Sequence, residues 1–285
     1  MAVTFWGWSF VATKIALGYV TPAELIGLRY ILGLPILATI IIGKSMPISF
    51  SGREWGRLVI AGGVVAAHFF IQVVGINYTS ATNTGWIISV SPLAIAVLSV
   101  IFLKEKLNWR QMTGIAVATG GILLLVSHGN LIQLDWLQSV GDWLVLASAH
   151  TWAIYTIITR DLSRKHRPLV VTFMILAFSS VVFIIWMLFR TDWGAVLSMP
   201  LQAKAAVGFL GVICTGVAFW LWQEAVARMG AARAGFFLYL EPLATTLLAV
   251  PYLNESFGLW SAVGGAAVLT GVFIAEKRRH PSSGQ

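Results

Sequence analysis

Residues 80–126 of this chain read SATNTGWIISVSPLAIAVLSVIFLKEKLNWRQMTGIAVATGGILLLV, and residues 230–276 repeat the pattern as GAARAGFFLYLEPLATTLLAVPYLNESFGLWSAVGGAAVLTGVFIAE. At an offset of 150 residues, twelve positions are identical: Ala81/Ala231, Gly85/Gly235, Pro92/Pro242, Leu93/Leu243, Ala94/Ala244, Leu98/Leu248, Val100/Val250, Leu103/Leu253, Glu105/Glu255, Gly114/Gly264, Ala116/Ala266 and Gly121/Gly271. Each copy holds two apolar runs joined by a short polar link, and Pro92 or Pro242 interrupts the first run. A repeat whose unit is a pair of membrane-length helices is typical of transporters built from two related halves.

The composition indicates a membrane protein. Of the 285 residues, 58% are apolar and 11% are charged, whereas about 25% are charged in a typical soluble domain. The charged residues separate apolar runs of about 17–25 residues, which is the length that crosses a bilayer. Ten such runs can be read, at approximately 2–20, 22–43, 57–76, 80–103, 109–126, 140–160, 168–189, 203–226, 231–252 and 257–275. The sequence therefore predicts an all-α polytopic membrane protein.

The repeat extends toward the N-terminus with a slightly smaller offset. Shifted by 146 residues, Trp6, Lys14 and Pro22 match Trp152, Arg160 and Pro168. Each half then holds five runs, and because five is odd, the second half must enter the membrane in the opposite orientation. We therefore expect ten transmembrane helices arranged as two inverted five-helix repeats, residues 1–126 and 139–276, followed by a basic tail at 277–285.

The positive charges predict the orientation of these helices. Of the nineteen Lys and Arg residues, fifteen fall on the links after even-numbered runs or in the C-terminal tail. The links after odd-numbered runs hold only Arg190 and Lys204, and Lys14 and Arg29 lie within runs. Because basic links stay in the cytoplasm, both termini are expected there. Membrane topology thus explains the net charge of +8 without a nucleic-acid partner, and we expect a monomer or a weak homodimer in the lipid bilayer.

The sequence lacks the usual marks of catalysis. It contains no Gly-x-x-x-x-Gly-Lys-Ser/Thr, His-Glu-x-x-His or Gly-x-Ser-x-Gly motif. The longest link, about residues 127–139, is too short for a catalytic domain, and the single cysteine, Cys214, excludes an intrachain disulfide. We therefore expect neither an enzyme nor an ATP-driven pump, and no metal or cofactor.

Several polar and aromatic side chains fall near the middle of the expected membrane spans. Counting about 1.5 Å per residue from the ends of the runs places there His68, Ser89, Ser91, Trp152, Tyr239 and Glu241. Polar groups in hydrocarbon are costly unless they face one another or a wet cavity. Inverted-repeat transporters bind substrate at this depth, where the two halves meet.

The residues predicted to bind substrate are His68, Gln72, Trp86, Ser89, Trp152, Tyr155, Tyr239 and Glu241. Structural alternatives stay open for several of them. His68 and Gln72 could bond to neighbouring helices, and Trp86 could belong to an aromatic belt at the membrane surface. Glu241 could stabilise its proline-broken helix against Lys14 or Arg29, or it could be a cavity carboxylate that binds a substrate amine or carries a proton.

An ordered set of short motifs covers essentially the whole chain and resembles the EamA-type drug/metabolite transporter superfamily. The motifs are Trp6-Gly7, Leu28-Arg29-Tyr30, Tyr78-Thr79-Ser80-Ala81, Ser91-Pro92-Leu93, Leu103-Lys104-Glu105-Lys106, Gly141-Asp142, Trp152-Ala153-Ile154-Tyr155, Leu240-Glu241-Pro242 and Leu253-Asn254-Glu255.

This resemblance implies ten transmembrane helices and a central cavity lined mainly by the first, third, fourth, sixth, eighth and ninth. It also implies transport of small metabolites, often outward across the bacterial inner membrane, and the aromatic cavity is similar to that of the YddG-like amino-acid exporter branch. The first run lacks the glutamate that four-helix multidrug relatives use there, which argues against proton-coupled multidrug antiport by that route. The expected function is an inner-membrane secondary transporter: an exporter or facilitator of amino acids, aromatic ones included, whose central cavity works by alternating access. The alternatives are a carrier for other metabolites or drugs, an intramembrane enzyme, and a channel.

Overall fold

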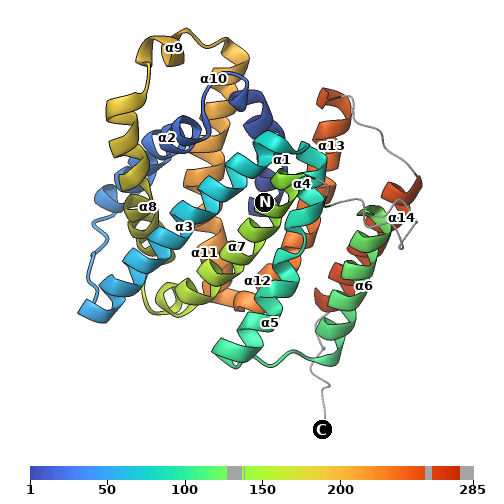
Figure 1. Ribbon diagram of the computed structural model, residues 1–285. Coiled ribbons are helices and arrows are strands. Elements are labelled where there is room, and N and C mark those ends of the chain that lie inside the picture. Colours follow the sequence, from blue (N-terminus) through green and yellow to red (C-terminus); the bar gives the residue numbers. More distant parts are fainter. Residues whose placement is uncertain (127–136, 138, 254–258, 277–285) are drawn as a thin grey trace.

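The chain folds into a bundle of long helices that run between two ends of the molecule (Figure 1). This computed structural model describes residues 1–126, 137, 139–253 and 259–276. The predicted link at 127–139, the polar link at 254–258 and the basic tail at 277–285 therefore lie largely or wholly outside the described residues.

The first half of the chain contains α1 (Ala2–Leu17), α2 (Pro22–Gly43), α3 (Gly52–Tyr78), α4 (Ala81–Ile88), α5 (Ser91–Leu103) and α6 (Trp109–Val126). The second half contains α7 (Val140–Lys165), α8 (Pro168–Arg190), the short α9 (Trp193–Ser198), α10 (Leu201–Gly208), the π-helical segment η1 (Phe209–Ala218), α11 (Phe219–Met229), α12 (Ala231–Phe236), the 3₁₀ segment η2 (Phe237–Leu240), α13 (Glu241–Leu253) and α14 (Leu259–Glu276). No strand occurs within these described ranges, as expected for an all-α protein.

Six helical stretches of the described chain are long and apolar enough to cross a membrane: Pro22–Gly43, Gly52–Tyr78, Ala81–Leu103, Pro168–Arg190, Leu201–Met229 and Ala231–Tyr252. Ala2–Leu17 and Ala262–Ala275 are shorter apolar helices. The helix α7 begins and ends with charged turns, at Asp142 and at Arg164 and Lys165.

Capping residues set several helix starts. At the start of α2, the Glu24 carboxylate accepts a hydrogen bond from the Thr21 backbone N–H at 2.8 Å, and the Thr21 hydroxyl accepts one from the Glu24 backbone N–H at 3.4 Å; together these bonds form a capping box. The same box forms at Ser51 and Glu54 of α3 and at Ser139 and Asp142 of α7. These polar first turns explain why α3 begins at Gly52 rather than at the predicted 57, since hydropathy marks only the apolar part of a helix.

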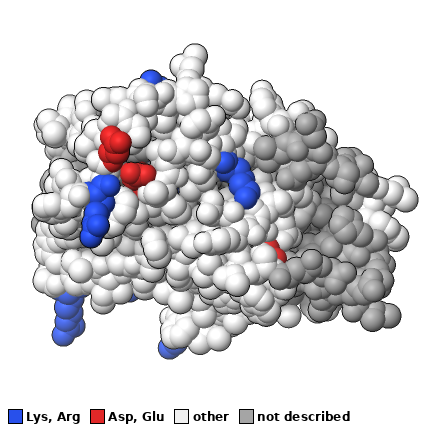
Figure 2. Space-filling model, turned by 45° about the horizontal axis from the view of Figure 1, so that its top comes forward, with Lys and Arg blue, Asp and Glu red and all other residues white. Residues whose placement is uncertain are grey.

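Polar contacts between links identify the two ends of the bundle. At one end, the Glu54 carboxylate pairs with Lys165 at 2.6 Å and with His166 at 3.1 Å. At the other end, the Asp142 carboxylate accepts hydrogen bonds from Thr79 at 2.5 Å and from Asn83 at 2.6 Å. We call the first the basic end, because most of the described Lys and Arg residues lie on its links. Figure 2 brings the top of Figure 1 forward, and its described surface carries few charged side chains.

Helices of the two sequence halves interleave rather than forming separate bodies. The helix α3 packs against α7 and α8, α2 packs against α8 and η1, and α1 packs against α13. The two helices α6 and α14 pack mainly against each other and stand at the side of the bundle (Figure 1).

Four glycines bring α6 and α14 into close contact. A Cβ atom added to Gly114 would lie 2.5 Å from the carbonyl oxygen of Gly271, and one added to Gly121 would lie 2.8 Å from that of Gly264. Small residues at such crossings let backbones approach and gain van der Waals contact where no hydrophobic effect drives helices together.

Candidate functional site

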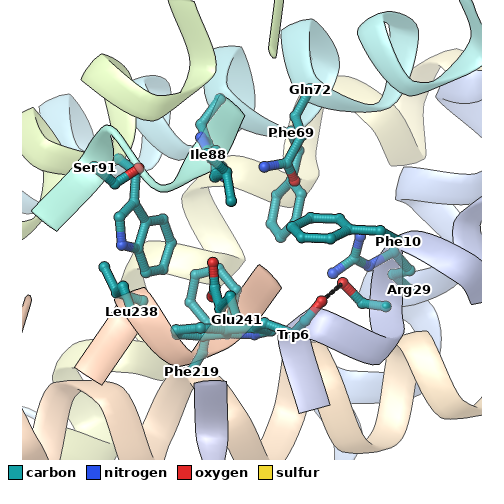
Figure 3. A pocket seen from close by; sticks show the side chains of 13 residues that line it. Trp6, Phe10, Arg29, Phe69, Gln72, Ile88, Ser91, Phe219, Leu238 and Glu241 are labelled. Carbon is teal, nitrogen blue, oxygen red and sulfur yellow. Dashed lines mark hydrogen bonds between the residues drawn. The ribbon is translucent and has the colours of Figure 1, made fainter. Parts of the chain in front are cut away.

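Thirteen side chains line a cavity of about 40 Å³ inside the bundle (Figure 3): Trp6, Ser9, Phe10, Arg29, His68, Phe69, Gln72, Ile88, Ser91, Trp152, Phe219, Leu238 and Glu241. They come from α1, α2, α3, the α4–α5 break, α7, α11 and the η2–α13 region. Both sequence halves therefore contribute to its wall.

Two broken helices present backbone ends to this cavity. The helix α4 ends at Ile88 and α5 starts at Ser91, while in the second half α12 gives way to a 3₁₀ segment and α13 starts at Glu241. In each case a proline follows the first residue of the new helix, where its missing N–H and fixed φ suit the first turn. The breaks thus place Ser91 and Glu241 at helix starts on the cavity wall, in repeat-equivalent positions.

The Glu241 carboxyl group points into the cavity (Figure 3). Its side chain is buried, with 4% exposed, and within the described residues no hydrogen bond or ion pair reaches its carboxylate oxygens. The alternative in which Glu241 pairs with Lys14 or Arg29 is not what the structure shows: the Lys14 ammonium donates to the Asn77 carbonyl oxygen at 3.4 Å. Because a buried carboxylate is costly without a partner, this group is a candidate to receive one from a ligand.

The Arg29 guanidinium lines the same cavity from α2 and is equally buried. Its Nε donates to the Thr215 hydroxyl at 3.0 Å, and its Cζ lies 4.4 Å from the centroid of the Phe69 ring. Thr215 lies in the π-helical segment η1, where its hydroxyl also donates to the Leu210 carbonyl oxygen at 2.9 Å. Such wide turns occur often at functional sites. In the described chain, the terminal nitrogens of Arg29 have no hydrogen-bond partner and remain available to an anionic group.

Other polar atoms on the cavity wall are also without partners. Within the described residues, Ser91 Oγ and Trp152 Nε1 are buried and have no hydrogen-bond partner. His68 Nδ1 lies 3.0 Å from the Ser148 carbonyl oxygen. A carbonyl oxygen can only accept, so Nδ1 carries the proton and Nε2 of the neutral ring is an acceptor. Buried polar atoms without partners are rare in folded proteins, and the presence of Ser91 and Trp152 on one wall with Arg29 and Glu241 makes this cavity a candidate ligand site.

Aromatic rings form an apolar side of the cavity. The Trp152 ring meets Trp6 at a centroid distance of 4.9 Å, His68 at 5.2 Å and Phe219 at 5.4 Å. Trp6 is fixed further because its Nε1 donates to the Cys214 carbonyl oxygen at 3.2 Å. The cavity therefore combines an acidic and a basic side chain with a rigid aromatic surface.

The structure brings together four of the eight predicted substrate-binding residues, namely His68, Gln72, Trp152 and Glu241. The other four lie elsewhere. Trp86 and Ser89 line a separate cavity of about 50 Å³ against α6, and Trp86 also borders a large apolar cavity of about 770 Å³ between α13 and α14.

Tyr155 and Tyr239 are also outside the cavity. Both are fully buried. The Tyr155 hydroxyl accepts a hydrogen bond from Gln223 at 2.5 Å, and the Tyr239 hydroxyl bonds to Thr119 at 2.9 Å. These contacts join helices, which is a structural role.

Sequence reasoning assigned no binding role to nine of the lining residues. They are Trp6, Ser9, Phe10, Arg29, Phe69, Ile88, Ser91, Phe219 and Leu238. Sequence features could have predicted two of them as binding residues. Arg29 is a charged residue within an apolar run, and Ser91, already placed near the middle of a span, is the repeat equivalent of Glu241.

Comparison with known proteins agrees with this architecture. A sequence model described as the EamA-like transporter family matches residues 1–127 and 139–276. An uncharacterized transporter of Archaeoglobus fulgidus is 27% identical over 98% of this chain and 96% of its own length. A probable terminal-alkyne amino-acid exporter of Streptantibioticus cattleyicolor is 24% identical over 95% of this chain and 93% of its own.

A solved crystal structure shares the fold, with a TM-score of 0.76 at 18% identity over 96% of this chain and 94% of that one. The family match spans both parts of the chain and agrees with the resemblance seen in the sequence motifs. The chain therefore belongs to the EamA-like transporter family, within the drug/metabolite transporter superfamily, and is a multi-pass membrane protein.

Proposed function

We propose that this protein is a secondary transporter that exports amino acids, or facilitates their passage, through the cavity between Arg29 and Glu241. The observation that carries this proposal is the presence of one acidic and one basic side chain, both buried on one cavity wall and not paired with each other. An α-amino acid is a zwitterion, so its carboxylate fits the Arg29 guanidinium and its ammonium fits Glu241.

The aromatic surface suits the rest of such a substrate. Trp6, Trp152 and Phe219 offer faces and edges to an apolar or aromatic side chain. The name of the Streptantibioticus cattleyicolor relative, an amino-acid exporter, supports the same substrate class.

The helix pattern supports ten membrane spans in two inverted repeats. The starts of α4, α5 and α6, at residues 81, 91 and 109, recur 150 residues later at the starts of α12, α13 and α14. Shifted by 150 residues, α3 falls at 202–228, within the Leu201–Met229 stretch. Counting α4–α5, α10–α11 and α12–α13 as one span each gives ten.

The size of the cavity supports alternating access. A volume of about 40 Å³ has room for about three water molecules and not for an amino acid. Substrate binding therefore requires helices to move apart, and the broken helices at Ser91 and Glu241 are where backbone angles can change at low cost.

Reconstitution of the purified protein in liposomes tests this function directly. The expected result is saturable and stereoselective counterflow of one or more amino acids. Flux that rises linearly with concentration would indicate a channel, and chemical conversion of the solute would indicate an enzyme. Counterflow of organic cations but of no amino acid would also contradict the proposal.

We expect the basic end to face the cytoplasm of a bacterial inner membrane, because of the excess of Lys and Arg on its links. In a Cys214→Ala background, Arg53→Cys probes the basic end and Gln202→Cys probes the opposite end; both positions are exposed. An impermeant maleimide should label Gln202→Cys in intact cells and Arg53→Cys only after permeabilisation. The reverse order would overturn the orientation.

The Trp152 indole N–H is expected to bond substrate. Trp152→Phe keeps an aromatic ring but removes the indole N–H donor. The apparent substrate affinity should therefore fall about three- to tenfold, the usual range for one net hydrogen bond. Trp222→Phe is a matched control: its Nε1 is also buried without a partner in the described residues, but Trp222 does not line the cavity. Equal affinities of the two variants in counterflow would remove Trp152 from the site.

A further inference from the structure

A second polar pocket lies at the basic end, where α5 and α7 end and α11 turns into α12. Its volume is about 360 Å³, and it is lined by Glu105, Lys106, Leu107, Gln111, Arg160, Arg164, Ala227, Arg228, Met229, Gly230, Ala232 and Arg233. It shares no residue with the central cavity, so the transport site does not account for it.

The charges on this pocket are strongly unbalanced. Five of the lining residues are basic, namely Lys106, Arg160, Arg164, Arg228 and Arg233, and one, Glu105, is acidic. The Glu105 carboxylate is already engaged: it accepts hydrogen bonds from the backbone N–H groups of Ala231 at 3.2 Å and Ala232 at 3.1 Å, and lies 3.2 Å from Arg160 Nε. The pocket therefore keeps an excess of positive charge.

Two of the basic side chains that line this pocket make no polar contact with the described residues. Within the described residues, Lys106 and Arg164 have no hydrogen bond or ion pair, whereas Arg228 pairs with Glu224. Lys106 follows α5 and Arg164 lies in the last turn of α7, so they approach the pocket from the two sequence halves.

The surface beside this pocket is apolar. On α5, Ile101 and Phe102 are 60% and 68% exposed, and Trp109 at the start of α6 is 78% exposed. Exposed aliphatic and aromatic residues at the end of a membrane helix lie against lipid chains and the interface. A basic pocket at this depth is placed where lipid phosphates lie.

We propose that this pocket binds a phosphate group, carried either by an anionic lipid headgroup or by a soluble phosphate ester. Arginine and lysine side chains from several segments supply the convergent N–H donors that phosphate oxygens require. A bound phosphate bridges Lys106 and Arg164, and so joins the end of α5 to the end of α7. This inference does not depend on the substrate proposed for the central cavity.

The test measures thermal unfolding of the purified full-length protein in a neutral detergent at low salt. Phosphatidylglycerol is titrated in one arm, phosphatidylcholine with the same acyl chains in a second, and glycerol 3-phosphate in a third. We expect a saturable rise in melting temperature with phosphatidylglycerol, or with glycerol 3-phosphate if the source is soluble, and none with phosphatidylcholine. High salt should weaken the effect.

A double variant locates the binding. Lys106→Gln with Arg164→Gln should lower the affinity for the effective phosphate ligand by roughly tenfold or more, since each basic residue contributes several-fold. Arg190→Gln with Lys204→Gln removes the same charge from the opposite end and should leave the affinity unchanged. The double variant Lys106→Arg with Arg164→Lys keeps both positive charges and should retain binding. Its affinity for the phosphate ligand provides a second measurement if the glutamine variant folds poorly.

Three results would overturn the proposal. The first is an equal loss of affinity in both glutamine double variants, which would indicate a general effect of surface charge. The second is stabilisation by phosphatidylcholine as strong as by phosphatidylglycerol. The third is the absence of stabilisation by either phosphate compound.

Discussion

Glu241→Gln is expected to reduce amino-acid flux at least about thirtyfold while the protein stays folded. Glutamine keeps the shape of the side chain and removes the charge that we assign to the substrate ammonium. Losing one partner of a buried charge pair costs about 2 kcal/mol or more, which corresponds to about thirtyfold in affinity. Because no described residue pairs with the Glu241 carboxylate, stability should be unchanged or slightly higher. Counterflow in liposomes and thermal unfolding of the same preparation measure the two effects.

A second glutamate provides the control for this result. Glu24 lies in the first turn of α2, outside the cavity, and closes a capping box that glutamine can also close. Glu24→Gln should therefore transport normally. Normal flux in Glu241→Gln, or a large loss of its stability, would remove Glu241 from the binding site and make it a structural residue.

Gly121→Val is expected to lower the melting temperature well below that of Gly120→Val. A Cβ atom at 121 would meet the Gly264 carbonyl oxygen at 2.8 Å and the Val268 N at 2.9 Å, whereas nothing lies within 4 Å of one at 120. Overpacking of this kind costs about 1–3 kcal/mol. Both positions lie in α6 and valine has the same helix propensity at each, so the difference isolates the contact with α14.

Thermal unfolding of the two valine variants in detergent measures this difference. Gly62→Ala and Gly63→Ala repeat the comparison on α3, where a Cβ at 62 would lie 2.6 Å from Phe178 Cβ and one at 63 meets nothing within 4 Å. Equal melting temperatures for Gly121→Val and Gly120→Val would show that α6 and α14 are not tightly packed in the folded protein.

The helix breaks could be predicted from sequence because their cause is local. A proline removes one backbone donor and restricts the residue before it, so Pro92 and Pro242 identified interruptions that the structure places at Ser89–Val90 and at Phe237–Leu240. Helix ends were less predictable. The helix α7 continues through the charged Arg164 and Lys165, where an apolar run has already stopped.

The candidate site could be predicted only in part, because distance along a helix fixes depth but not direction. Ser89 and Tyr239 were placed at the depth of Glu241, yet Ser89 lies against α6 and Tyr239 bonds to Thr119. Which way a side chain faces depends on which helices are neighbours, and the packing of α1 on α13 or of α2 on η1 is set by contacts far apart in the sequence. For the same reason the sequence left open whether Arg29 pairs with Glu241, and could not show that the two line one cavity without pairing.

The paired glycines of α6 and α14 carry a consequence for how the two halves of the chain can diverge. Gly114 touches Gly271 and Gly121 touches Gly264, while the repeat makes Gly114 equivalent to Gly264 and Gly121 equivalent to Gly271. Each half thus offers the other the same surface, which is the isologous contact of a symmetric dimer contained in one polypeptide. A larger residue at either member of a pair would meet the backbone of the other, which has no side chain that could be shortened, so no substitution at the partner position can make room for it.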